Sequence, residues 1–402
     1  MVTLADVQAA RARIRDSIRV TPAAYSEILS RESGNSVLLK LENLHVTGSY
    51  KERGALNGML CMSEEQRARG VIAASAGNHA AGVAYHAGRL GVKATIVMPL
   101  YTPLVKVSST QSWGAEVVLH GENFDEALTE ARRRAQAGGL TFLHAFNDPA
   151  VIAGQGTVGL ELLDQIPDLE AVVVPVGGGG LIAGIGCAIK QTRPDVRLIG
   201  VEPSALPSMT AALAAHQPVE IPAAPTVADG VAVRRVGDLT LTAAETYVDE
   251  MVTVDDEEIA MAILRLLEKQ KTLAEGAGAV GVAALLQRKT SLRGKRTAVV
   301  ISGGNIDVTF LAHIIERGLV KDGGLVRLRI TLSDHPGGLQ RLTALIAQQR
   351  ANIVQVIHDR TYFGVHLGEA KIDVTMETRG ATHAEEMMET LQRSGYAFER
   401  VL

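Results

Sequence analysis

The sequence predicts an α/β protein with two parts: a large region of parallel sheet and helices, followed by a small β-α-β-β-α-β unit. Short β-branched runs alternate with longer amphipathic stretches as far as Ile301. This pattern changes after the polar, glycine-containing break Lys321-Asp-Gly-Gly324. The chain of 402 residues is also longer than one ordinary core requires, so more than one domain is expected.

Short apolar runs in the first part are predicted strands, because strands buried on both faces of a parallel sheet read as continuous apolar segments. These runs are Val37–Leu41, Val71–Ala74, Ala94–Met98, Glu116–Leu119, Ala171–Val176, Arg197–Val201 and Thr297–Ile301. The predicted helices between them include Asn123–Ala137, Ile152–Leu163 and Glu257–Lys269, the last with Asp255 and Glu258 as a capping box. In a doubly wound sheet of this kind, ligands bind beyond the carboxyl ends of the strands.

The second part has the element order of a ferredoxin-like unit. The elements are strand Leu325–Leu332, helix Gly338–Gln349, strands Ile353–Asp359 and Ala370–Met376, helix Ala381–Ser394 and strand Tyr396–Val401. We therefore expect one domain over residues 1–320 and a second over 325–402.

Composition limits the classes of function. The net charge of −4, without a long basic run, argues against binding to nucleic acids or anionic membranes. The two cysteines, Cys61 and Cys187, cannot form a disulfide framework or a cysteine-rich metal site. Met1–Val20 reads as an amphipathic helix without the apolar core of a signal peptide, and no run is long enough to span a bilayer. A cytoplasmic enzyme is expected.

A glycine run marks the first candidate site. Predicted strand Val172–Val176 leads into Gly177, Gly178, Gly179 and Gly180, and a helix follows from Leu181. Consecutive backbone N–H groups at a helix start suit a phosphate. Gly178-x-Gly180-x-x-Ala183 also loosely matches a dinucleotide fingerprint, with Glu202 after the next strand as a ribose-binding acid. A nicotinamide-dependent dehydrogenase, or a loop that binds nothing, therefore remains an alternative.

Three further segments accompany the glycine run: Ser49-Tyr-Lys51-Glu-Arg-Gly54-Ala55, Ser75-Ala-Gly-Asn-His-Ala-Ala-Gly82 and Ser302-Gly-Gly-Asn305. Together the four segments resemble the fold type II enzymes that use pyridoxal 5'-phosphate (PLP), specifically the threonine/serine dehydratases. The resemblance extends to Ala228–Val231 and Glu275–Ala279, and the C-terminal unit resembles an ACT domain. It implies a tryptophan synthase β-like core of two subdomains, the smaller at about residues 50–150. The length of the chain and its single ACT-like unit resemble those of the medium-length threonine ammonia-lyases.

The resemblance implies roles for particular residues. Lys51 would form a Schiff base with PLP and then remove the Cα proton of the substrate. The amides of Gly177–Gly180 and Leu181 would hold the phosphate, and Asn78 would bond the phenolic oxygen. Ser302 would face the pyridine nitrogen, where a neutral hydroxyl favours loss of a β-substituent over transamination. Ser302 could alternatively be a helix N-cap.

The asparagine segment is the expected substrate site. Its residues Ser75, Ala76, Gly77, Asn78 and His79 would bind the α-carboxylate of the substrate. Asn78 could also be a turn-forming residue, and His79 could simply pack at a helix start. Next to the cofactor lysine, Glu52 and Arg53 are expected to be structural or solvated.

The expected reaction converts L-threonine to 2-oxobutanoate and ammonia, and L-serine to pyruvate, with isoleucine biosynthesis as one setting. A serine dehydratase, a serine racemase or a hydroxyaspartate dehydratase of the same fold is an alternative. Serine racemases carry a second serine at the position of Ala76, and an alanine cannot transfer a proton.

No metal site is predicted. Some relatives bind a cation through an acid matching Glu202 and a second acid, but the second position here is Ser208, so Glu202 would be a surface acid at a strand end. The C-terminal unit could bind isoleucine or valine at a subunit interface of a homodimer or homotetramer. The residues expected there are Pro336, Gly337, Gly338, Asn352 and Ile353. A dimerisation module without a ligand is the alternative.

Overall fold

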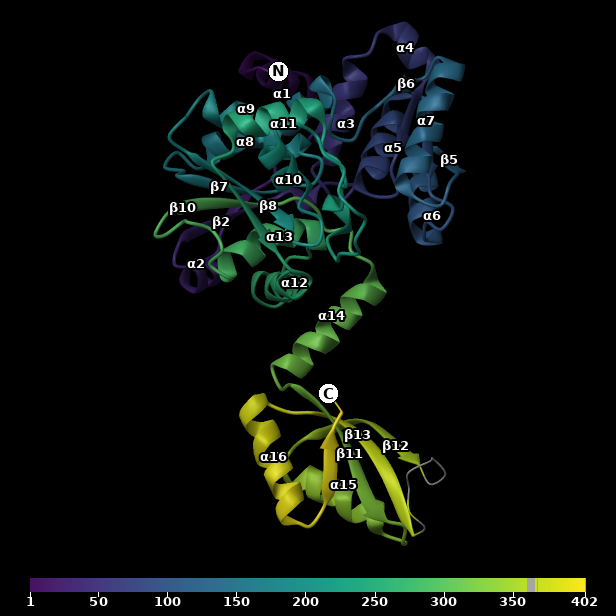
Figure 1. The fold of residues 1–402 in the computed structure, drawn as a ribbon, viewed down its shortest axis with the longest axis vertical. Helices are drawn as coiled ribbons and strands as arrows, with labels where there is room; N and C mark the ends of the chain where they lie inside the picture. Colours follow the sequence, from purple (N-terminus) through teal and green to yellow (C-terminus); the bar gives the residue numbers. More distant parts are fainter. Residues whose placement is uncertain (360–365, 367, 402) are drawn as a thin grey trace. The chain divides into compact units, whose positions relative to one another are not determined.

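The structure, a computed structural model, describes residues 1–359, 366 and 368–401. The chain divides into two compact units, Met1–Ile306 and Asp307–Leu402, each described separately below (Figure 1). The division precedes helix α14 (Val308–Lys321), whereas the sequence pattern indicated a boundary at 321–324. The reason is that α14 contacts strand β11 (Leu325–Ser333) of the second unit.

A six-stranded sheet forms the centre of the first unit, in the order β1-β2-β10-β7-β8-β9. All neighbours are parallel except β1, an antiparallel edge strand. The strands are β1 (Ala23–Tyr25), β2 (Ser36–Leu41), β7 (Ala171–Pro175), β8 (Arg197–Pro203), β9 (Glu250–Val254) and β10 (Arg296–Ile301). The predicted parallel α/β architecture is confirmed.

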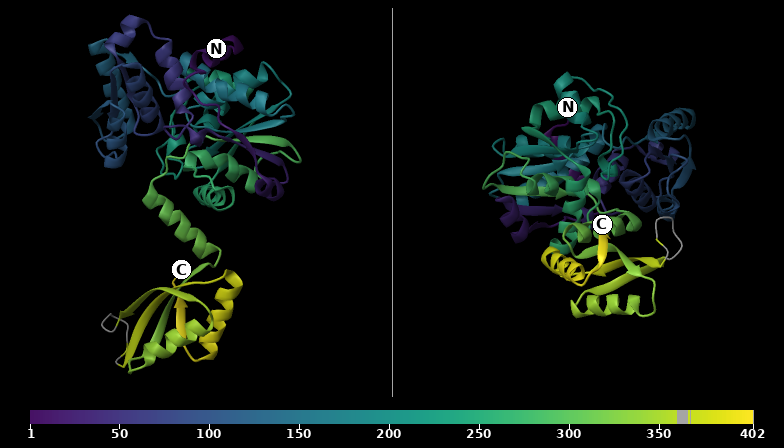
Figure 2. Two further views of the ribbon diagram at one scale, coloured as in Figure 1. Left: turned by 180° about the vertical axis from the view of Figure 1, so that it is seen from behind. Right: turned by 60° about the horizontal axis from the view of Figure 1, so that its bottom comes forward.

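Helices cover both faces of this sheet (Figures 1 and 2). They are α1 (Leu4–Ile14), α2 (Glu27–Ser33), α8 (Pro149–Gln165), α9 (Gly180–Lys190), α10 (Ser208–Ala215), α11 (Asp238–Tyr247), α12 (Asp256–Gln270) and α13 (Gly276–Leu286). Val172 and Val174 share a core with α1, α8, α9 and α11. Val173 faces Gly281 of α13 instead, so alternate residues of β7 serve opposite layers.

A second, smaller parallel sheet has the order β5-β4-β3-β6. Its strands are β3 (Val71–Ala74), β4 (Ala94–Met98), β5 (Glu116–Leu119) and β6 (Thr141–Phe142). The helices associated with it are α3 (Lys51–Leu60), α4 (Glu64–Arg69), α5 (Asn78–Leu90), α6 (Leu104–Ser112) and α7 (Phe124–Gly138). Apolar residues of α3 and α5 form a core on one face, and α7 packs on the other.

The second unit contains a four-stranded antiparallel sheet in the order β12-β13-β11-β14. After β11 its elements are α15 (Gly338–Gln348), β12 (Asn352–Asp359), β13 (Glu369–Glu377), α16 (Ala381–Arg393) and β14 (Ala397–Arg400). Apolar residues of α15 and α16 share one core with the sheet. This confirms the predicted β-α-β-β-α-β order.

Short 3-10 turns η1 (Glu42–Leu44) and η2 (Asp229–Val231) complete the elements. The predicted capping box at Asp255 and Glu258 is present at the start of α12. Among the helices of the described residues, none combines the length and apolar character needed to cross a membrane.

Candidate active site

The parallel sheets bring the four sequence segments to two sheet edges. β10 lies between β2 and β7, so the chain leaving each of these strands emerges at the same edge. These exits lead to Lys51, to Ser302 and to the glycine run. In the smaller sheet, β3 neighbours β6, so segment 75–79 and loop 143–147 share an edge in the same way.

Lys51 is the first residue of α3. Its Nζ donates a hydrogen bond to the backbone oxygen of Ala145 at 3.0 Å and lies 5.2 Å from the centre of the Tyr50 ring. Burial lowers the pKa of the Lys51 amine to about 8, and the negative charge of Glu275 opposes part of this change. A far larger share of the amine is therefore neutral, and thus nucleophilic, near neutral pH than for an ordinary lysine.

The glycine run forms a turn ahead of α9, whose N-cap Gly179 has a φ of +89° and offers no side-chain cap. Within the described part of the chain, the N–H groups of Gly177, Gly178 and Gly179 donate to no protein oxygen, although all three residues are buried. Buried backbone donors are nearly always paired. Unpaired N–H groups at an uncapped helix start therefore fit a phosphate group.

One loop connects the lysine and the glycine turn. Ala145 accepts the hydrogen bond from Lys51, and the next residue, Phe146, packs against Gly178 and Gly180. A Cβ at Gly180 would lie 2.9 Å from Phe146, and one at Gly178 would overlap its ring. The amine and the glycine turn thus contact neighbouring residues of the same loop, as a single cofactor that binds to both would require.

Asn78, the first residue of α5, belongs to a polar network. Its Nδ2 donates to Glu275 Oε1 at 2.6 Å, and its Oδ1 accepts from Asn305 Nδ2 at 2.7 Å. Glu275 is buried, and burial raises the pKa of its carboxyl to about 7, with nearby Asp229 contributing. Sequence reasoning did not assign Glu275 or Asn305 to the site. For Glu275, the available signal in the sequence was its position as an acid directly before the apolar helix Gly276–Leu286.

Ser302 directly follows β10 and is buried. Its backbone oxygen accepts a hydrogen bond from Tyr50 N at 3.1 Å, which joins it to the residue before Lys51. The alternative of a helix N-cap is wrong, because α14 begins at Val308 and its N-cap is Asp307.

Segment 75–79 forms a tight turn into α5. The Ser75 hydroxyl accepts a hydrogen bond from Gly77 N at 3.2 Å, and Ala76 is half-buried. His79 is buried with its Nε2 3.0 Å from the Leu143 oxygen, and burial lowers its pKa to about 3. A histidine held neutral in this way packs against loop 143–147 and is not an acid at neutral pH.

Of the two alternatives for Glu52 and Arg53, the structural one holds, and one expectation about an acid requires correction. Both residues are buried: Arg53 pairs with Glu42, and Glu52 accepts a hydrogen bond from Thr47 N. Glu202 is not a surface acid, because it is fully buried and accepts hydrogen bonds from the amides of Met209 and Thr210 at 2.7 and 2.9 Å. These bonds hold the start of α10.

The residues expected to bind an effector occupy opposite ends of the C-terminal sheet. Pro336, Gly337 and Gly338 follow the carboxyl end of β11, and Gly337 has a φ of +85°. Asn352 begins β12 and pairs with Glu377, which on its other side pairs with Leu325 at the amino end of β11. One chain therefore does not bring the two groups together.

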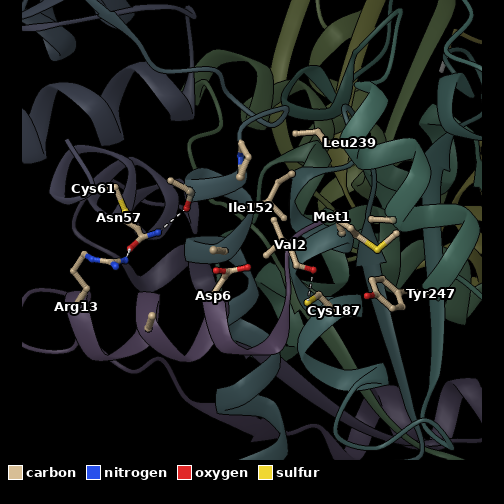
Figure 3. A pocket seen from close by; sticks show the side chains of 16 residues that line it. Met1, Val2, Asp6, Arg13, Asn57, Cys61, Ile152, Cys187, Leu239 and Tyr247 are labelled. Carbon is tan, nitrogen blue, oxygen red and sulfur yellow. Dashed lines mark hydrogen bonds between the residues drawn. The ribbon is translucent and has the colours of Figure 1, made fainter. Parts of the chain in front are cut away.

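A pocket of about 300 Å³ lies among α1, α3, α8, α9 and α11 (Figure 3). Both cysteines and the α1 side chains Asp6 and Arg13 line it. None of the predicted site residues does, so this pocket is separate from the lysine and the glycine turn.

Comparison with known proteins matches residues 14–303 to the family described as pyridoxal-phosphate dependent enzymes. The chain belongs to this family. It is 50% identical over 396 residues to the L-threonine ammonia-lyase of Thermotoga maritima, covering 98% of each chain.

Among solved structures, it is similar to threonine deaminase isoform 2 of Solanum lycopersicum, with 39% identity and a TM-score of 0.74 over 78% of this chain and 91% of that one. It is also similar to maize serine racemase, with 32% identity and a TM-score of 0.75 over 80% of this chain and 98% of that one.

Membership of the family settles two points. The enzyme depends on PLP, and the nicotinamide-dependent dehydrogenase drawn from the loose fingerprint is wrong. Glu202 also cannot be a ribose-binding acid, since its carboxylate is used within the protein to hold α10.

Proposed function

We propose that the protein is an L-threonine ammonia-lyase that converts L-threonine to 2-oxobutanoate and ammonia, and L-serine to pyruvate. The observation that carries this proposal is the Lys51 amine bonded to Ala145 while Phe146 covers the unpaired glycine turn. The names of relatives at 50% and 48% identity, both L-threonine ammonia-lyases, support the choice of substrate.

PLP, when bound, supplies an electron sink for the charge that develops at the substrate Cα. The amides of Gly177–Gly180 and Leu181, at the positive end of α9, would neutralise its phosphate. Asn78, fixed by Glu275 and Asn305, would orient the ring through its phenolic oxygen. These residues bind and orient; they need not exchange protons.

Lys51 would move the proton at Cα. With a pKa of about 8, its amine can be neutral at working pH and still be basic enough to accept that proton. The Ala145 oxygen gives the amine a fixed acceptor whenever it is not covalently engaged. At the start of α5, Ser75–His79 would receive the substrate carboxylate on backbone N–H groups.

Ser302 would favour elimination. A carboxylate at the end of β10 would hold the ring nitrogen protonated, whereas a serine hydroxyl leaves it neutral. With PLP bound, a serine at this position would therefore favour loss of the β-hydroxyl over transamination.

The decisive test is replacement of Lys51 by alanine. We expect Lys51→Ala to yield no covalent PLP adduct after borohydride reduction and no 2-oxobutanoate from threonine above background. Lys269→Ala, which removes an exposed lysine of α12, is the control and should behave as the wild type. An adduct on another lysine, or undiminished 2-oxobutanoate release by Lys51→Ala, would reject the assignment.

We also propose that isoleucine or valine regulates the enzyme through the C-terminal unit. An effector that touches both Gly337 and Asn352 requires two copies of the unit, because these residues lie at opposite ends of one sheet. Each amino acid should be titrated into a steady-state threonine assay of the wild type and of Asn352→Ala. A response in the wild type that Asn352→Ala weakens supports the proposal; unchanged kinetics with both amino acids rejects it.

A further inference from the structure

A buried ion cluster beside Lys51 has no part in the chemistry described above. It joins residues of β2, η1, α3 and α8, and all its members are buried: Lys40, Glu42, Arg53 and Glu161. Arg53 bonds Glu42 through Nε at 2.7 Å and Nη2 at 2.8 Å. It bonds Glu161 through Nη1 at 2.6 Å and Nη2 at 2.9 Å.

The cluster is balanced and well bonded. Lys40 Nζ lies 2.5 Å from Glu161 Oε2, so two cations face two carboxylates. Thr157 Oγ1 accepts a further bond from Arg53 Nη1 at 3.1 Å. Burying such a cluster costs about as much desolvation energy as it returns, so its main contribution is geometric specificity rather than stability.

Arg53 connects the lysine helix to two other elements. It lies in the first turn of α3, two residues after Lys51, and binds Glu42 next to the end of β2. It also binds Glu161 and Thr157 of α8, and loop 143–147, which contains the Ala145 acceptor for Lys51, leads into α8. The cluster therefore fixes the amine and its acceptor relative to each other.

Close packing of α3 against α8 also fixes the position of these two helices relative to each other. Gly54 N of α3 donates to Gln155 Oε1 of α8 at 3.1 Å. A Cβ at Gly154 would lie 2.7 Å from the backbone oxygen of Arg53, so the two backbones meet here without intervening side chains. Sliding α3 along α8 would break this contact and the Arg53 bonds together.

We propose that Arg53 is a positioning residue, which through Glu42 and Glu161 holds the first turn of α3 so that the Lys51 amine is presented to the cofactor. This inference rests on the proposed role of Lys51. Borohydride trapping at Lys51 in the wild type tests that role separately.

The experiment compares four variants with the wild type: Arg53→Lys, the double variant Arg53→Met with Glu161→Met, Thr157→Val and Leu266→Ala. The double variant removes one charge of each sign, so Lys40 loses its partner Glu161 and Glu42 loses its partner Arg53. Leu266→Ala, a buried residue of α12, is the control for lost stability. Four quantities are measured: the rate at which PLP becomes trappable on Lys51 of cofactor-free protein, the kcat for threonine, the KM for threonine and the melting temperature.

We expect the double variant to melt lower than the wild type, because Lys40 and Glu42 lose their ion-pair partners, and its trapping rate and kcat to fall about tenfold or more with little change in KM. Arg53→Lys should show a similar fall in trapping rate and kcat relative to the wild type, because lysine lacks the planar fork that bonds both carboxylates. Thr157→Val should show a smaller loss of the same kind. Leu266→Ala should melt lower yet trap PLP at the wild-type rate.

The proposal is overturned if the double variant or Arg53→Lys traps PLP and turns over threonine at wild-type rates. It is also overturned if Leu266→Ala loses trapping rate in proportion to its melting temperature. If the double variant does not fold, Arg53→Lys and Thr157→Val decide by the same criteria. A wild type that forms no adduct at Lys51 would instead refute the proposed function.

Discussion

Burial, more than any neighbouring charge, controls the pKa of the Lys51 amine. The residue that most opposes the effect of burial on its pKa is Glu275. Burial raises the pKa of the Glu275 carboxyl to about 7, so this carboxyl can be charged or uncharged near neutral pH. The two groups should therefore respond to pH in related but separable ways.

The rate of PLP attachment should follow the neutral fraction of Lys51. Because the pKa of the amine is about 8 instead of 10.5, we expect attachment to cofactor-free protein to accelerate with rising pH and to level off above about 8. Stopped-flow absorbance of PLP binding across pH measures this. Glu275→Gln, which removes the opposing charge, should shift the midpoint lower; a wild-type midpoint near 10 would contradict the prediction.

Glu275 should make stability depend on pH. Its folded pKa of about 7 lies above the ordinary 4.5, so the folded state holds a proton that the unfolded state releases between these values. The resulting contribution to the free energy of unfolding is fully present below pH 4.5. It is lost as the pH rises through about 7, and the loss is at most roughly 3 kcal/mol. Urea unfolding of cofactor-free protein should show that the free energy of unfolding falls less between about pH 5 and pH 8 for Glu275→Gln than for the wild type. Equal losses would reject this assignment.

Ala76 should limit the enzyme to elimination. It lies in the turn before α5 and carries no group that could transfer a proton from the second face of the substrate. We expect no D-serine from L-serine by chiral chromatography, and a detectable amount from Ala76→Ser. D-serine formation by the wild type at a rate close to that of pyruvate would contradict this.

Glycines set the spacing of the helices behind the site. A Cβ at Gly184 of α9 would lie 2.5 Å from Gly156 N and would also collide with the Ile152 oxygen of α8. Gly184→Ala should therefore lower the free energy of unfolding by about 2 kcal/mol or more, measured by urea titration. Gly138→Ala at the end of α7 is the control, since its nearest neighbour would be Leu140 Cγ at an ordinary 3.5 Å. Equal effects of the two changes would contradict this account.

Sequence pattern located most strands closely, including β5 at an edge of the smaller sheet, but missed the edge strands β1, β6 and β9. Val71–Ala74, Ala94–Met98 and Glu116–Leu119 match β3, β4 and β5 residue for residue. The strands β1 and β6, of three and two residues, escaped because they are too short to show a period. At the amino end, the expected helix over Met1–Val20 is the shorter Leu4–Ile14.

Local sequence patterns could not predict contacts between segments that are distant in the chain. Glu202 looks like a surface acid in sequence, and only the fold of α10 back onto it explains its burial. Glu275 and Asn78 are 197 residues apart, so nothing local indicates their hydrogen bond. The glycine run and Lys51 were recognisable as candidates because their chemistry lies in the local sequence itself.

At the scale of the whole molecule, the chain divides into two compact units after Ile306. Among the described residues, the core between the large sheet and helices α8 and α9, like the core of α3 and α5 on the small sheet, is built from residues before Ile306. A chain ending at Ile306 should therefore fold, form the PLP adduct at Lys51 and retain elimination of threonine, while losing any response to isoleucine or valine. Absorbance of bound PLP and the steady-state assay test this against the full chain. Failure of the shortened chain to bind PLP would show that residues 307–402 support the core.

The contact between Lys51 and Ala145 has a consequence for natural and engineered variation. The acceptor is a main-chain oxygen, so every amino acid at position 145 would supply it equally. Substitution of Ala145 should leave the hydrogen bond of the Lys51 amine intact. Variation of the side chain at this position is therefore compatible with an essential role for its backbone. Selection should fall instead on whatever keeps this stretch of backbone in place, above all the aromatic ring that follows it.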